Sequence, residues 1–450
     1  MKNWLKSSLA AAGVLVVSAS AFALTGCGSK SHIKNNSSDV LYNGGIVSVV
    51  GNDLVFVNGY NSAEISSMDD YKIFAETGYL ATTSLSSPTD RYTGTNAQKL
   101  NSENLGFANA YSFVYGDNIY YAAPNKHKTS SNTHLFNYLS FFRCGFDGKG
   151  AKEFFTTTSF DSAKSQIRAL KFQDNAYWAI FDGKQLNVIN LNNNKVKLVS
   201  EEATSVALPR EGEDWNGKIL FTENKKNEFG QTGNAVKEYN VASGETTDLN
   251  NSQGQTVAFT GRTGDDVFYS LTKATVTNTR LASANEISTT TIETAGEVFY
   301  SSEISSVYAI GDEGDGYEGY LFSSSLSGNA QMMYMKVGET AASPILKNGD
   351  YSTIFLTNED LVYYSTTDGI YSKNVVTKDV TTIVKGMTLT TNMLGYDFTE
   401  NGYVDNIYFY AQREYAEDDE TKEEDRDKNV YMFTTPAHGQ GQVKLVSKTK

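Results

Sequence analysis

The acidic loop between residues 312 and 319 contains the side chains best suited to ligand chemistry. Gly314-Asp315-Gly316-Tyr317-Glu318-Gly319 fits the pattern G-x-G-x-x-G, which binds a pyrophosphate where a strand meets a helix N-terminus. Acidic side chains repel a phosphate, and no helix is predicted to follow, so we expect no nucleotide. Asp312, Asp315 and Glu318 carry the oxygen ligands that Ca²⁺ prefers. Gly314 stands where a calcium-binding loop needs an acid, so the match to such a loop is incomplete. A calcium site and an exposed hairpin tip are therefore both possible interpretations of this loop.

Histidine and cysteine offer little further chemistry. The chain has four histidines and no H-E-x-x-H motif, and His127 and His134 lie in a polar loop without a nearby cysteine, so we predict no other metal site. Cys144 alternates with Phe142 and Phe146, which indicates a small core residue rather than a nucleophile. The nucleophile elbow G-x-S-x-G is absent. We therefore assign no catalytic residue and no cofactor other than the possible calcium.

A short motif recurs along the chain and predicts its organisation. In each copy a turn dipeptide such as Gly116-Asp117 precedes a run of β-branched and aromatic residues, which is typical of the start of a strand. The copies lie about 50 residues apart, a spacing typical of propellers and other repeat arrays. The residues that precede the eight apolar runs are Asp53, Asn118, Asn175, Gly217, Asp266, Ser306, Asp360 and Asn406.

The third repeat shows how many strands each unit contains. Asn-, Asp- and Gly-rich turns, which tolerate positive φ, separate four short runs at 167–172, 176–181, 185–191 and 195–199. Four antiparallel strands per repeat are typical of a β-propeller blade. We therefore predict an all-β propeller over residues 40–450 with eight four-stranded blades. Seven blades are the alternative, because the copy at Ser306 is poor.

The first residues have the composition of a secretory leader. Two lysines precede an apolar run over 9–23, which is shorter than the roughly 20 residues of a bilayer span but fits a signal peptide. The run ends in Leu24-Thr25-Gly26-Cys27, which resembles the lipobox of bacterial lipoproteins at all four positions. The resemblance implies cleavage after residue 26 and lipidation of Cys27. The alternative is an ordinary cleaved signal peptide with an accidental cysteine.

These features predict a membrane-anchored protein with a signal peptide over 1–26 and a tether over 27–39. The tether residues after Cys27 are polar and small, so we expect a flexible coil. The folded domain is then expected on the extracytoplasmic face of the membrane, at the cell surface. Since lipidation would consume Cys27, Cys144 would be left without a cysteine partner, and no internal disulfide is expected.

The charge of the chain argues against one class of partner. The net charge is −14, and such a surface repels phosphate backbones, so we expect no nucleic-acid partner. Nine acidic residues gather between Glu414 and Asp427, interleaved with Lys and Arg. This insertion, 413–428, is interpreted as a solvated charged segment; a docking site for a basic partner is the alternative.

Three strand and turn segments carry a family resemblance. Val55-Phe56-Val57-Asn58-Gly59-Tyr60, Ile119-Tyr120-Tyr121 and Phe142-Arg143-Cys144-Gly145-Phe146-Asp147-Gly148 are similar to those of uncharacterised clostridial-type lipoproteins. The β-propeller of those proteins, a domain of unknown function, is likened to that of the low-density-lipoprotein-receptor-related protein. The resemblance covers most of residues 44–450 but lacks the receptor's Tyr-Trp-Thr-Asp signature. It implies a fold and no functional residue.

Together these expectations describe a lipid-anchored binding or scaffolding module. Its ligand would be a glycan, peptide or protein at one mouth of the ring, a location that rests on fold analogy. The alternative is a lipid-anchored hydrolase of glycans or peptides, since paired carboxylates contributed by different repeats leave no spacing pattern. Saturable binding without turnover would favour the first interpretation, and turnover the second.

Overall fold

The structure is a computed structural model that describes the chain from residue 33 to residue 448. Within these limits, the residues that it does not describe are 60–76, 101–105, 108–111, 126–137, 162, 210–215, 227–231, 252–255, 264–265, 274–275, 284–303, 312–317, 325–330, 337–338, 340–341, 348, 388, 418, 424–425, 427–429 and 440.

The described chain is built from antiparallel sheets, with one short 3₁₀ helix, η1 (Asn43–Gly45), before the first strand. Four sheets fill the first half of the chain: β1 (Val47–Val50), β2 (Asp53–Asn58), β3 (Thr77–Ser84) and β4 (Gln98–Lys99), with β5 (Gly106–Phe107) also on β3; β6 (Phe113–Tyr115), β7 (Asn118–Pro124), β8 (Leu139–Gly145) and β9 (Lys152–Thr156); β10 (Gln166–Phe172), β11 (Asn175–Phe181), β12 (Leu186–Asn190) and β13 (Lys195–Ser200); β14 (Ala203–Ala207), β15 (Lys218–Lys226), β16 (Thr232–Asn240) and β17 (Thr246–Asn251).

The second half continues in the same way. Its sheets are β18 (Thr256–Thr263), β19 (Asp266–Lys273) and β20 (Val276–Ser283); β21 (Ile304–Ile310), β22 (Gly319–Ser324), β23 (Gln331–Lys336) and β24 (Ser343–Lys347); β25 (Thr353–Asn358), β26 (Leu361–Ser365), β27 (Gly369–Asn374) and β28 (Val380–Lys385); β29 (Leu389–Phe398), β30 (Val404–Gln412), β31 (Val430–Pro436) and β32 (Lys444–Leu445).

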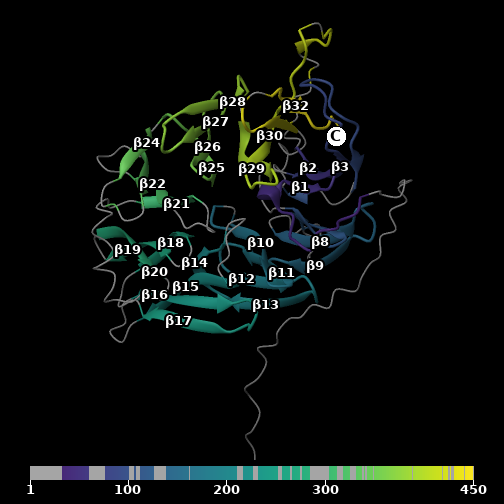
Figure 1. The fold of residues 1–450 in the computed structure, drawn as a ribbon. Coiled ribbons are helices and arrows are strands. Elements are labelled where there is room, and N and C mark those ends of the chain that lie inside the picture. Colours follow the sequence, from purple (N-terminus) through teal and green to yellow (C-terminus); the bar gives the residue numbers. More distant parts are fainter. Residues whose placement is uncertain are drawn as a thin grey trace, which may run out of the picture.

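The sheets are blades arranged around a common centre (Figure 1). The first strand of one sheet contacts the first strand of the next, as β21 contacts β25 and β25 contacts β29, so the first strands lie innermost. Apolar side chains of neighbouring blades pack between the sheets; Trp178, for example, lies edge-on to Phe113 and Phe141 at centroid distances of 4.9 and 4.7 Å. Burial of such faces is the main stabilising term of the ring.

The predicted number of eight four-stranded blades is wrong. Seven sheets have four or more strands and form complete blades, whereas β18–β20 has three described strands. Seven of the eight motif copies belong to second strands, from β2 to β30, as the repeat predicts. The motif therefore marks a hairpin of two strands and not a complete blade. Counting motif copies gives too many four-stranded blades, because the hairpin β18–β19 pairs with only one further described strand, β20.

The motif copy at Ser306 was also misplaced within its blade. Ser306 lies in β21, the first strand of its sheet, and the second strand is β22, which begins at Gly319. Tyr320, Leu321 and Phe322 of β22 are buried. The apolar run that matches the other repeats thus follows the glycine-rich acidic loop directly.

The last blade closes the ring against the first. Tyr408, Tyr410 and Met432 pack into one cluster with Val47 and Phe56 of the first blade. The Tyr410 hydroxyl donates a hydrogen bond of 2.6 Å to the carbonyl oxygen of Val57. Near the C-terminus, Ser447 forms a parallel bridge with Thr95. The amide of Leu445 also donates to the carbonyl oxygen of Asp90 at 2.8 Å. Closure therefore joins the two ends of the described chain by side-chain packing and by backbone hydrogen bonds.

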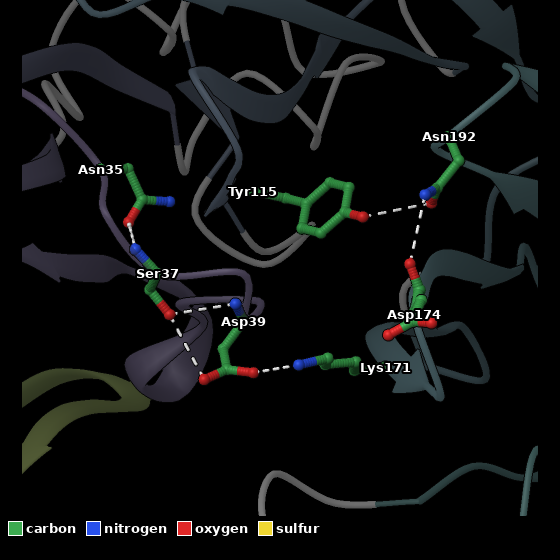
Figure 2. Close-up of polar contacts among 7 residues, drawn as sticks. All are labelled: Asn35, Ser37, Asp39, Tyr115, Lys171, Asp174 and Asn192. Carbon is green, nitrogen blue, oxygen red and sulfur yellow. Dashed lines mark hydrogen bonds and ion pairs between the residues drawn. The ribbon is translucent and has the colours of Figure 1, made fainter.

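The segment before the first blade lies against one end of the blades (Figure 2). Asn35 donates from Nδ2 to the carbonyl oxygen of Gly116 at 3.0 Å, and Asp39 forms an ion pair with Lys171. The backbone of Leu41 then pairs with Val114 of the inner strand β6. We call this end, where turns such as Gly116–Asp117 join first to second strands, the tether face. The opposite end, where turns such as 182–185 join second to third strands, is the far face.

Candidate functional site

Of the three residues of the possible calcium site, only Glu318 lies within the described structure. Asp312 and Asp315 lie outside the described residues, as do Leu24, Thr25, Gly26 and Cys27. Glu318 is exposed in the connection between β21 and β22, and its amide donates to the carbonyl oxygen of Ile310 at 2.8 Å. In the described part of the chain, no three His, Cys, Asp or Glu residues are grouped as a metal site requires.

Cys144 is a core residue, as predicted. Its side chain is 2 % exposed, between the first two blades. Burial, with a smaller contribution from the charge of Asp147, raises the pKa of its thiol to about 12. Because the thiolate is the reactive form, the folded protein holds this cysteine unreactive. His127 and His134 lie outside the described residues.

The acidic insertion is held against the last and first blades where the structure describes it. Arg91 pairs with Glu414, and the guanidinium groups of Arg413 and Arg426 lie 4.8 and 5.1 Å from the ring centre of Tyr415. Two arginines over one tyrosine ring form cation–π contacts. Two arginines of this segment, Arg413 and Arg426, thus contact its own tyrosine ring.

A buried carboxylate lies at the far face of the third blade. Asp182 is fully buried directly after β11. Its Oδ1 accepts hydrogen bonds from the amides of Lys184 and Gln185 at 2.9 and 2.7 Å, which holds the turn between β11 and β12. Its Oδ2 is also buried but has no hydrogen-bond partner among the described residues. A buried oxygen without a partner is costly, so this atom requires an explanation.

Two further polar atoms lie in the same region. Asn187 of β12 pairs with Ile180, two residues before Asp182, so both side chains project from the same side of the sheet. Asn187 is 4 % exposed, and its Nδ2 also lacks a partner within the described chain. The same holds for the buried Oγ of Ser159. We call Ser159, Asp182 and Asn187 the far-face polar group.

Ser159 belongs to the segment 158–161, which contacts the turn between β11 and β12. The amide of Asp161 donates to the carbonyl oxygen of Asp182 at 2.8 Å. Thr158, which is exposed, donates from its hydroxyl to Oε1 of Gln185 at 2.8 Å. Ser159 lies between these two anchors in the chain, and its buried hydroxyl belongs to the segment that contacts this turn.

The far-face polar group combines complementary hydrogen-bonding types. Asp182 supplies an acceptor, Asn187 supplies a donor, and Ser159 supplies a hydroxyl that does both. A ligand hydroxyl or a water molecule, each of which donates and accepts, matches this set. Sequence analysis missed the group because Asp182-Gly183-Lys184 has the composition of an ordinary turn, and the burial of Asp182 depends on the segment that crosses it.

A second buried carboxylate, Asp397 of β29, differs in having partners. It is 7 % exposed and accepts hydrogen bonds from the Asn406 amide at 2.7 Å and from the Tyr408 hydroxyl at 2.9 Å. Burial raises the pKa of Asp397 in spite of these bonds. Burial, together with the neighbouring charge of Asp397, raises the pKa of Tyr408 strongly. Both oxygens of Asp397 are used within the blade, which indicates a structural role.

Comparisons with known proteins assign this chain to no family. No known protein family matches the sequence, and no curated protein does either. Among solved structures, an oligogalacturonate lyase in complex with manganese is similar at a TM-score of 0.43 and 10% identity, over 86% of this chain and 97% of that one. TolB from Acinetobacter baumannii is similar at a TM-score of 0.32 and 11% identity, over 73% and 80% of the two chains.

A puromycin-hydrolyzing peptidase of Mycobacterium tuberculosis is similar at a TM-score of 0.43 and 9% identity, over 75% of this chain. The match spans 53% of that peptidase, so about half of its length has no counterpart here. At such identities and TM-scores, no substrate, metal or activity is carried over to this chain.

Proposed function

We propose that this chain is an extracytoplasmic lipoprotein, anchored through Cys27, whose propeller binds a hydroxyl-bearing ligand at the far face. The observation that carries the binding proposal is the far-face polar group, in which Asp182 Oδ2 and Asn187 Nδ2 are buried without a partner among the described residues. A glycan hydroxyl can donate to the first and accept from the second. A glycan is therefore the ligand class that this chemistry favours over an apolar peptide.

The position of the tether supports the same proposal. Residues 35–41 contact the tether face, at Gly116, Lys171 and Val114. An anchor at Cys27 would hold this face toward the membrane. The far face would then point away from the membrane, where an extracellular or envelope ligand can reach it. Because Asp182 is fully buried, binding requires the segment that carries Thr158 and Ser159 to move aside.

A glycan array probed with purified residues 31–450 tests the binding proposal. We expect saturable binding that Asp182→Asn weakens at least about tenfold, because one hydrogen bond to a charged group contributes roughly 1.5–3 kcal/mol. The asparagine in this variant would keep the Oδ1 that caps the turn and replace only the second oxygen. Asp174→Asn, a change in the tether-face turn between β10 and β11, is the matched control and should bind as the wild type does.

Three outcomes separate the alternatives. Binding that Asp182→Asn leaves unchanged would contradict the proposed site. Turnover of a glycan or peptide substrate by the same preparation would favour the hydrolase interpretation. If no glycan binds and crosslinked cells yield a stable protein partner instead, the module is a scaffold.

The anchor is tested separately by Cys27→Ala in cells. Loss of the lipid should move the protein from the membrane fraction into the medium, because acyl chains contribute about 0.8 kcal/mol per buried CH₂ to membrane binding. A substitution of Ser31, outside the proposed lipobox, is the control and should leave the fractionation unchanged. Retention of the Cys27→Ala variant in the membrane fraction would contradict anchoring through Cys27.

A further inference from the structure

Exposed apolar side chains gather on the tether face. The described chain has eight exposed large hydrophobic residues, and five of them lie at turns or strand ends of this face. Their exposed fractions are 37 % for Leu85, 56 % for Val376, 53 % for Val380, 44 % for Phe398 and 53 % for Tyr403. The remaining three lie on the outer strand β13 and in the loop between β3 and β4. Such clustering marks an interaction surface more often than scattered exposure does.

Backbone contacts place these residues on neighbouring blades. Phe398 and Tyr403 flank the turn between β29 and β30, and Asn358, at the matching turn of the preceding blade, donates from Nδ2 to the carbonyl oxygen of Gly402 at 3.0 Å. Val376 and Val380 flank the turn between β27 and β28 of that preceding blade.

Leu85 extends the patch to the first blade. Its amide donates to the carbonyl oxygen of Asn52, in the turn between β1 and β2, at 2.8 Å. The five residues thus span three consecutive blades: the one before the last, the last and the first. The next blade carries Gly116, to which Asn35 of the tether is bonded. We call these five residues the apolar sector.

We propose that the apolar sector lies on the lipid bilayer and inserts its side chains among the headgroups. This inference rests on the proposed lipidation of Cys27. Asn35 lies eight positions after Cys27, and a fully extended chain spans at most about 28 Å over eight residues. An anchored protein would therefore keep the part of the tether face that Asn35 contacts within about 28 Å of the bilayer.

The chemistry of the sector suits the interface between water and lipid. Tyrosine and phenylalanine are favoured at this depth, and apolar side chains there add to the binding of an anchored protein. The chain as a whole carries a charge of −14, so an anionic bilayer does not attract it by charge. The lipid anchor and the apolar sector must then supply the attraction together.

The test uses the full lipidated chain in vesicles of phosphatidylcholine and phosphatidylglycerol in equal parts. A Tyr403→Cys variant is labelled with an environment-sensitive fluorophore; Cys144, which is buried, is not expected to take the label. Glu202→Cys provides the control, because Glu202 lies at the far face with its side chain 75% exposed. We expect the label at position 403 to shift its emission to the blue and to be quenched by aqueous iodide about threefold less than the label at position 202.

Two failures have different meanings. If the protein floats with the vesicles but both labels are quenched equally, the anchor holds and the orientation inference is wrong. If the protein does not float with the vesicles at all, the proposed anchoring is wrong, and the inference that depends on it is wrong as well.

A second variant tests the apolar sector itself. Phe398→Ser in the labelled chain should reduce the blue shift at position 403, whereas Leu198→Ser on the outer strand should not.

Discussion

Two buried carboxylates in this protein show how partners decide the role of a residue. Asp397 has both oxygens bonded to Asn406 or Tyr408, inside one blade. Asp182 has one oxygen bonded to turn amides and the other without a partner among the described residues. A satisfied buried carboxylate rigidifies its surroundings, whereas an unsatisfied one has hydrogen-bonding capacity left for a ligand. For this reason we place the binding proposal at Asp182 rather than Asp397.

The raised pKa of Asp397 predicts how its contribution to stability depends on pH. Burial is the largest cause of the shift from the ordinary value of 3.8. The folded protein therefore keeps this proton at pH values where the unfolded chain has released it. The stabilising contribution of this carboxyl group to the free energy of unfolding is fully present below pH 3.8, the ordinary pKa. It is lost as the pH rises through the raised pKa of the folded state.

Urea unfolding of the wild type and of Asp397→Asn at a series of pH values measures this contribution. The free energy of unfolding of the wild type, minus that of the variant, should fall as the pH rises and then become constant. Asp174→Asn, a change at an exposed turn of another blade, is a suitable control. A difference that stays constant from acid to neutral pH would contradict the raised pKa.

At the scale of elements, close approach of backbones fixes how the last blade meets the first. Gly59 follows β2 with a φ of +35°, and a Cβ at this position would lie 1.7 Å from the carbonyl oxygen of Val430 in β31. Gly51, in the turn between β1 and β2, has a φ of +61° but no atom within 4 Å of a Cβ. The two glycines share an unusual backbone conformation and differ in crowding.

This difference predicts unequal costs for two alanine substitutions. Gly51→Ala should lower the free energy of unfolding by about 1 kcal/mol, the cost of a left-handed conformation. Gly59→Ala should lower it by at least about 3 kcal/mol, because two backbones must also separate. Chemical denaturation of both variants measures the difference. Equal losses of free energy of unfolding would contradict this prediction, because they would show that Gly59 and Val430 can move apart at little cost.

At the scale of the whole molecule, stability depends on closure of the ring. Leu445 and Val446 are fully buried, and Ser447 forms the parallel bridge with Thr95 of the first blade. In a repeat array each unit is stabilised by its neighbours, so an open ring leaves two blades with one uncovered side each. The few residues after β31 are therefore expected to contribute strongly to the stability of the whole ring.

Deletion of residues 443–450 tests this dependence. The shortened chain should unfold at a lower denaturant concentration and less cooperatively, with faster hydrogen exchange in β1 and β2, far away in the sequence. Deletion of residues 449–450 alone is the control and should have no such effect. Unchanged exchange in the first blade would show that the ring does not depend on this closure.

Sequence alone determined the repeat, the strand type and the start of most second strands, because a turn dipeptide followed by an apolar run is a local signal. It also determined the burial of Cys144, since alternation assigns one strand face to the core. The number of complete blades was decided by pairing: β19 matches the motif as well as β11 does, but β20 gains no fourth strand among the described residues.

Tertiary structure alone brought the functional candidates together. The segment that carries Ser159 reaches Asp182 through the backbone of Asp161. Leu85 shares a face with Val376 and Phe398 because ring closure places the first and last blades side by side. Such contacts join residues that are distant along the chain. Residue spacing does not encode them, because blade geometry rather than local chain conformation determines which turns become neighbours.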